Sequence, residues 1–112
     1  MPYVHLTTNK NLSDNEKVDI KNFIIDAIQV IPGKGISNTM VQIDNAYMFF
    51  KQDDAKCIFI DLRVYKKQEE IHKQEFINKM CEYLKEKLGI EKEFIYFNIL
   101  ELDSWVTNGL IK

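Results

Sequence analysis

The order strand, helix, strand occurs twice along the chain, and this repeat constrains the fold more than any other feature. Strands are indicated by alternating apolar and polar side chains, and helices by apolar side chains at helical spacing. The three elements of the first half lie at residues 3–8, 14–31 and 39–44, and those of the second half at residues 56–65, 69–88 and 94–99. Two such units with right-handed crossovers predict an α/β fold, with one four-stranded mixed sheet and two helices on one face.

The ends of the helices are marked by residues with a clear local role. Ser13 and Glu16 have the spacing of a capping box, in which each side chain binds the backbone N–H of the other residue. Pro32 cannot continue a helix, so it ends the first one, and Gly89 supplies the turn after the second.

Two helices can cover only one face of the predicted sheet. The opposite face is polar and aromatic, and its residues are Tyr3, His5, Gln42, Asp61, Arg63, Tyr65, Tyr96 and Asn98. Such a face either tolerates water or packs against another molecule, and the edge strands remain open to pairing. We expect association through this face and these edges.

Length and charge limit what the protein can do. The 112 residues fit a single domain spanning 1–112. Because 15 basic side chains are outnumbered by 17 acidic ones, there is no excess of positive charge to neutralise phosphates, and we expect no nucleic-acid partner. No apolar run approaches the roughly 20 residues that span a bilayer, so we expect no membrane association either.

The cysteines and histidines do not suggest a metal or a disulfide framework. Cys57 and Cys81 are interpreted as reduced thiols, and His5 and His72 are isolated from other metal ligands. The N-terminus has no charged segment followed by an apolar one, so no secretory signal is visible and we expect a cytoplasmic protein.

Pro2 directly follows the initiator methionine and is the most informative single residue. It can simply begin a strand, where proline is tolerated. If Met1 is removed, however, Pro2 carries a free secondary amine, which titrates near pH 8 without help. Burial or a nearby positive charge lowers that pKa, and the amine can then remove a proton from carbon next to a carbonyl.

Several short motifs, in order along the chain, resemble one family. They are Met1-Pro2 before Thr7-Thr8-Asn9, Pro32-Gly33-Lys34 after the first helix, the strand Ile58–Tyr65, Leu88-Gly89-Ile90 before Phe94-Ile95-Tyr96-Phe97-Asn98, and Trp105 with Asn108-Gly109. Together they resemble the tautomerase superfamily, in the branch of macrophage migration inhibitory factor and phenylpyruvate tautomerase.

The resemblance implies a homotrimer whose sheets form a central barrel, with active sites between subunits. It implies that Pro2 is the catalytic base and that Lys34 binds a substrate carboxylate. Asn98, with Tyr96 beside it, would bind the substrate carbonyl or ring from a neighbouring subunit, and the backbone amide of Tyr65 would hold the carboxylate. The implied reaction is keto–enol tautomerisation of a phenylpyruvate-like 2-keto acid, without metal or cofactor.

Without the resemblance, the same residues have ordinary interpretations. Lys34 could complement the dipole of the preceding helix, and Tyr96 and Asn98 could be half-buried strand residues. The chain also departs from the family pattern at Lys51-Gln52-Asp53, at Tyr65-Lys66, at Thr107 and at Lys112. Two alternatives therefore stay open: another superfamily reaction, such as decarboxylation or hydration with Arg63 and protonated Pro2 as electrophiles, or a non-catalytic, cytokine-like trimer.

Overall fold

The computed structural model describes residues 2–51 and 54–112, so Met1, Gln52 and Asp53 lie outside the described residues. The strands of the main sheet are β1 (Tyr3–Thr8), β2 (Met40–Asn45), β3 (Ile58–Tyr65) and β4 (Ile95–Leu102). The helices are α1 (Asp14–Ala27) and α2 (Glu70–Leu88), with 3-10 turns η1 (Ile28–Val30), η2 (Ile36–Asn38) and η3 (Lys92–Phe94). A hairpin of β5 (Val106–Thr107) and β6 (Leu110–Ile111) follows β4.

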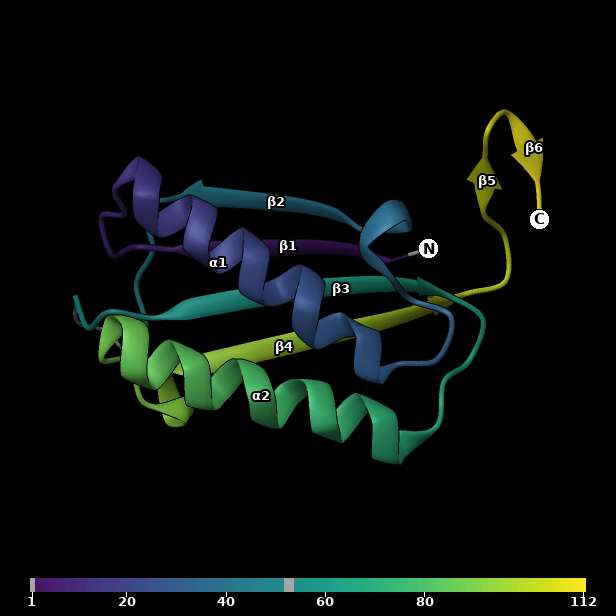
Figure 1. The fold of residues 1–112 in the computed structure, drawn as a ribbon. Coiled ribbons are helices and arrows are strands. Elements are labelled where there is room, and N and C mark those ends of the chain that lie inside the picture. The colour runs from purple at the N-terminus through teal and green to yellow at the C-terminus, as the bar shows by residue number, and fades with distance from the viewer. Residues whose placement is uncertain (1, 52–53) are drawn as a thin grey trace.

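The sheet has the strand order β2-β1-β3-β4. β1 pairs in parallel with β2, β3 pairs in parallel with β4, and β1 and β3 are antiparallel. Figure 1 shows α1 and α2 lying side by side on one face of this sheet. The two predicted βαβ units and the mixed four-stranded sheet are therefore confirmed.

The core lies between the helices and the sheet because the apolar side chains alternate as the sequence predicts. Along β3, the residues Ile58, Ile60, Leu62 and Val64 are buried, and α2 buries Phe76, Met80, Leu84 and Leu88 against them. The opposite face of the sheet is not covered within this chain, as expected from two helices.

The predicted ends of the helices agree with the structure. Ser13 and Glu16 form both bonds of the capping box, and Gly89 ends α2 with a φ of 71°. The first helix, however, stops being α-helical at Ala27 and continues as the 3-10 turn η1, before Pro32 is reached. The second begins at Glu70, because Glu69 has extended backbone angles.

Three strands differ from the prediction at one or both ends. The second strand is Met40–Asn45, one residue later than predicted, and the third begins at Ile58 rather than at residue 56. The N–H of Cys57 is bound by the Asn9 side chain at 2.9 Å rather than by a neighbouring strand. The fourth strand continues to Leu102, because the end of β3 provides a partner as far as Tyr65.

Two side chains at the end of β1, those of Asn9 and Thr8, clamp the segment before β3. The Asn9 amide donates to the backbone oxygens of Met48 at 3.1 Å and Ala55 at 2.9 Å, and its oxygen accepts the N–H of Cys57. The Thr8 hydroxyl, which is buried, donates to the oxygen of Cys57 at 2.8 Å. These bonds hold Met48, Ala55 and Cys57 against the end of β1.

Candidate functional site

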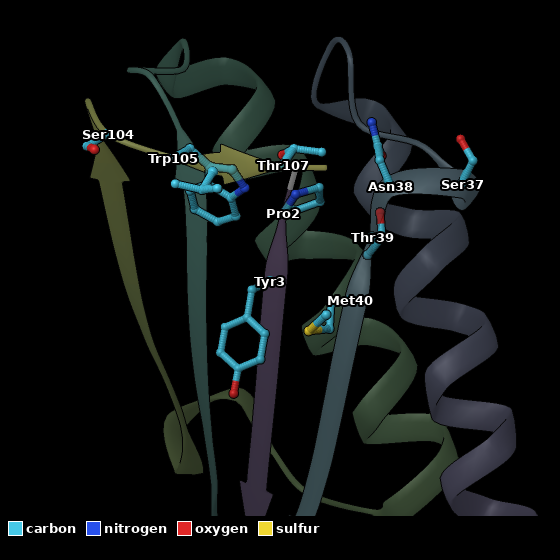
Figure 2. A pocket seen from close by; sticks show the side chains of 10 residues that line it. Pro2, Tyr3, Ser37, Asn38, Thr39, Met40, Ser104, Trp105 and Thr107 are labelled. Carbon is cyan, nitrogen blue, oxygen red and sulfur yellow. The ribbon is translucent and has the colours of Figure 1, made fainter. Parts of the chain in front are cut away.

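A cavity of about 600 Å³ opens at the end of the sheet where β1 begins. It is bounded by the start of β1, by η2 with the start of β2, and by the segment that leads into β5. Its lining residues are Pro2, Tyr3, Ser37, Asn38, Thr39, Met40, Ser104, Trp105, Val106 and Thr107. Figure 2 shows Pro2 between Trp105 on one side and Asn38 and Thr39 on the other, with Thr107 above it.

Strand pairing brings η2 to Pro2. Tyr3 pairs with Met40, and the Met40 N–H donates to the Pro2 oxygen at 3.0 Å. The residues just before Met40 must therefore lie beside Pro2. The Asn38 side chain accepts the Gly35 N–H at 2.9 Å and the Thr39 hydroxyl donates to the Gly35 oxygen at 2.7 Å, which fixes the turn.

The other wall comes from the start of the C-terminal hairpin. Asn108 and Gly109 have φ angles of 54° and 73°, as the two central residues of a type I′ turn require. The Lys112 N–H donates to the Trp105 oxygen at 2.8 Å and closes the hairpin. Trp105 and Thr107 are half-buried beside Pro2.

The cavity is neutral. Pro2 is buried, and none of the ten lining residues carries a charged side chain. An amine at this position would lose hydration, and desolvation disfavours the protonated form of an amine. The lining combines an apolar surface, chiefly Trp105, Val106 and Met40, with hydroxyl and amide groups, which suits a small organic substrate with a few polar atoms.

Lys34 and Tyr65 lie at the same end of the sheet as Pro2 but do not line the cavity. Lys34 is half-buried in the turn that leads into η2. Tyr65 ends β3 two residues beyond Arg63, which pairs with Tyr3. Its ring packs 5.0 Å from the Lys66 ammonium group.

Tyr96 and Asn98 lie away from Pro2 within this chain. Asn98 is in register with Asp61, which pairs with His5 at the middle of the sheet, and Tyr96 is in register with Phe59, which pairs with Thr7. The row that contains Tyr96 is four residues from the row that contains Tyr3, or roughly 13 Å at the usual rise of a strand. Both side chains are exposed.

The wall formed by Ser37, Asn38 and Thr39 is missing from the sequence-based site. The register between β1 and β2 would reveal it, because Tyr3 pairs with Met40 and the residues before Met40 must then meet Pro2. The alternation pattern alone does not give that register.

Arg63 lies on the uncovered face of the sheet rather than in the cavity. Its guanidinium group contacts the Asp61 carboxylate at 3.3 Å and lies 5.9 Å from the Tyr3 ring. The feature that would have favoured decarboxylation or hydration, Arg63 within the cavity, is not observed. On the same face, His5 and Asp44 are bound at 2.7 Å.

Two further searches concern metals and membranes. In residues 2–51 and 54–112 there is no cluster of three or more metal-ligating His, Cys, Asp or Glu side chains. No helix within the described part of the chain has the length and apolar character needed to cross a bilayer. Cys57 and Cys81 are both free thiols, as predicted.

Comparison by sequence finds no relative: no protein-family profile and no curated protein matches the chain. Comparison by structure finds many. MIF2 of Leishmania major superposes with a TM-score of 0.90 at 14% identity, covering 100% of this chain and 97% of the other. The macrophage migration inhibitory factor-like protein of Entamoeba histolytica gives 0.87 at 22% identity, covering 99% and 98%.

A third similar structure is Pt0534 inactivated by 2-oxo-3-pentynoate, with a TM-score of 0.84 at 16% identity, covering 97% of this chain and 95% of the other. The protein has the MIF-like tautomerase superfamily fold. The resemblance given by the short motifs is thus confirmed for the fold of the single chain. In this tautomerase-fold chain, Pro2, Trp105 and Thr107 share one cavity, while Tyr96 and Asn98 lie elsewhere.

Proposed function

We propose that the protein is a cofactor-independent keto–enol tautomerase acting on a phenylpyruvate-like 2-keto acid, with the Pro2 amine as the general base. The observation that carries the proposal is the burial of Pro2 in a neutral, largely apolar cavity. The similar structure of Pt0534, inactivated by 2-oxo-3-pentynoate, adds that a protein of this fold can react with a 2-keto acid.

The proposed chemistry follows from the position of the amine. Once Met1 is removed, the ring nitrogen of Pro2 is a secondary amine whose protonated form is disfavoured by burial. It removes a proton from C3 of the keto acid, so that a C2–C3 double bond forms and the carbonyl electron pair moves to the carbonyl oxygen. The protonated amine then gives that proton to the oxygen, which completes the enol and restores the free amine. In the ketonisation direction, the amine takes the proton of the enol hydroxyl and delivers it to C3. General base catalysis of this kind contributes about 10²–10⁴-fold to the rate.

Lys34 is the proposed partner of the substrate carboxylate. It lies in the turn that leads into η2, whose residues Ser37 and Asn38 line the cavity, and it would supply the positive charge that the neutral lining lacks. The carboxylate of the substrate would point out of the cavity towards Lys34, with C3 at Pro2. The backbone amide of Tyr65, at the same end of the sheet, is the second proposed contact of the carboxylate.

We further propose a homotrimer, because Tyr96 and Asn98 can reach Pro2 only from a second chain. Two features of this chain support self-association. The face of the sheet opposite the helices is uncovered, and the hairpin exposes Val106, Leu110 and Ile111. A two-stranded hairpin alone is marginal in water, so a neighbouring surface would stabilise it. Light scattering should return three times 13.3 kDa, and a monomer at micromolar concentration would exclude the shared site.

The test is the rate of phenylpyruvate enol–keto exchange across pH in the wild type, Pro2→Gly and Lys34→Ala. Pro2→Gly keeps an amine but loses the ring that directs it, so activity should fall without vanishing. Lys34→Ala should raise KM by about tenfold or more, the value of one charge-assisted hydrogen bond. A positive neighbour lowers the pKa of an amine, so removing the Lys34 charge should raise the pKa of the Pro2 amine. The acidic limb of the kcat/KM profile should therefore move to higher pH in Lys34→Ala.

A matched control is Lys21→Ala, since Lys21 is an exposed lysine on α1 that does not line the cavity. It should leave both KM and the pH profile unchanged. Phenylpyruvate exchange at the uncatalysed rate in the wild type, from a preparation shown to be trimeric and to lack Met1, would instead favour the non-catalytic alternative. That alternative is supported by Thr107, which lines the cavity beside Pro2 and is one of the positions where the chain departs from the family pattern.

A further inference from the structure

A part-buried ion pair lies outside the cavity and is not used in the proposed reaction. Lys73, in the first turn of α2, is only 8% exposed. Its ammonium group lies 2.8 Å from a carboxylate oxygen of Glu70 and 3.3 Å from both carboxylate oxygens of Glu101, near the end of β4. Glu70 is an exposed partner, whereas Glu101 is largely covered.

Glu101 also fixes the turn between β3 and α2. One of its carboxylate oxygens accepts the backbone N–H of Gln68 at 2.6 Å. The Gln68 side-chain amide in turn donates to the backbone oxygens of Tyr65 and Lys66, both at 3.1 Å. The Glu101 carboxylate therefore ties the end of β4 to the turn that follows β3.

The two segments held by Glu101 both lead to the proposed site. Tyr65 closes β3 at the end of the sheet where Pro2 lies, and the chain continues from Glu101 through four residues to Trp105, which lines the cavity. The Lys66 N–H donates to the Leu102 oxygen at 2.8 Å, next to Glu101, which adds a second tie between the same segments.

Stability alone is a poor explanation for this arrangement. Burying a lysine and a carboxylate costs much of what their attraction returns, and apolar residues of similar size often stabilise a fold as well or better. A buried pair does differ from an apolar contact in direction, because its hydrogen bonds require one geometry. The pair is therefore suited to fixing where the ends of β3 and β4 lie.

We propose that Glu101, held by Lys73, is a positioning residue that fixes the Trp105 wall of the cavity and the Tyr65 end of β3. The effect on substrate binding rests on the proposed function, whereas the effect on Trp105 does not. Glu101 does not line the cavity, so it is not among the groups that would contact the substrate.

The test uses Trp105 as a reporter, because the chain contains a single tryptophan. Glu101→Gln and Lys73→Met should shift Trp105 emission to the red and increase its quenching by acrylamide, measured well below the melting temperature of each variant. Glu70→Gln is the matched control. It removes the other carboxylate bound to Lys73, but the Glu70 side chain does not bind the turn, so the emission and quenching of Trp105 should not change. Unchanged Trp105 in Glu101→Gln, or an equal change in Glu70→Gln, would overturn the proposal.

A double variant separates positioning from stability. Lys73→Met with Glu101→Leu replaces the pair by apolar side chains and should recover most of the melting temperature, yet Trp105 should stay as accessible as in Glu101→Gln. If quenching returns to the wild-type value together with stability, the pair acts only on stability and the proposal fails.

Kinetics give a second readout. With phenylpyruvate, Glu101→Gln should raise KM by about tenfold with kcat within about twofold, because a displaced wall weakens binding before it changes the base. A fall in kcat with unchanged KM would contradict this. If the wild type shows no exchange activity, the proposed function fails, and the fluorescence comparison still decides the role of Glu101.

Discussion

The Asn9 side chain should make a large contribution to the stability of the segment before β3. It makes three hydrogen bonds, two to the oxygens of Met48 and Ala55 and one from the N–H of Cys57. At about 1 kcal/mol net for each bond, Asn9→Ala should lower the free energy of unfolding by about 3 kcal/mol. For a domain of this size that corresponds to a fall in Tm of about 12 °C.

The assay is urea denaturation followed by circular dichroism, at one protein concentration, since dissociation of an oligomer would make the midpoint depend on concentration. Asn11→Ala is the matched control. Asn11 is exposed at the rim of the same loop and has no side-chain hydrogen bond to the described residues. It should change stability by less than about 0.5 kcal/mol.

Asn9→Asp sharpens the test. An ionised carboxylate can still accept the Cys57 N–H but faces two backbone oxygens instead of donating to them, so the variant should be less stable than Asn9→Ala at neutral pH. Those oxygens raise the pKa of the new carboxyl group, and its protonated form can donate again. Its deficit should therefore shrink as the pH falls below that pKa. A loss under about 0.5 kcal/mol in Asn9→Ala would refute the clamp.

Three further predictions concern backbone strain, thiols and pH. Lys66 has a φ of 70°, a left-handed conformation that costs a residue with a side chain about 1–2 kcal/mol. Glycine avoids that strain but loses more backbone entropy on folding, so Lys66→Gly should raise the free energy of unfolding by about 0.5–1 kcal/mol. A lower midpoint in urea would contradict this. Burial raises the pKa of the Cys57 and Cys81 thiols, so both should react slowly with a disulfide reagent at pH 7 and rapidly in denaturant; fast native labelling would count against it. The hydrogen bond from the Gln68 N–H, and then Lys73, lower the pKa of Glu101 in the folded protein. Its contribution to stability is therefore present above the ordinary pKa of 4.5 and is lost as the pH falls through the folded pKa. Between pH 6 and about pH 2.5, the Tm of Glu101→Gln should fall less steeply with decreasing pH than that of the wild type.

Sequence patterning predicted the fold because the elements bury one face with regular spacing. The buried side chains of β3, from Ile58 to Val64, alternate without interruption, and α1 and α2 keep their apolar stripes. The end of β4 was missed because Leu100, Glu101 and Leu102 continue the strand through pairing with β3, with weaker alternation. The C-terminal hairpin was missed although Asn108-Gly109 is a strong turn signal, since each of its strands has only two residues.

The site was predicted only in part, because periodicity gives faces but not distances. Pro2 was expected at the site and lies in a cavity, and the Trp105 segment lies beside it. The turn at residues 37–39 could not be assigned without the register between β1 and β2. Tyr96 and Asn98 share a strand face with each other, yet the register of β4 separates them from Pro2 within one chain. Their role remains a prediction about a second copy.

The central claim is that the amine of Pro2 is the base, and blocking that amine tests it most directly. Phenylpyruvate enol–keto exchange is measured on a preparation whose intact mass shows loss of Met1, and on the same chain with one alanine inserted before Pro2. The insertion turns the Pro2 nitrogen into an amide, which cannot accept a proton near neutral pH. The account predicts exchange with the free amine and only the uncatalysed rate with the insertion. Equal activity of the two preparations would show that another group is the base.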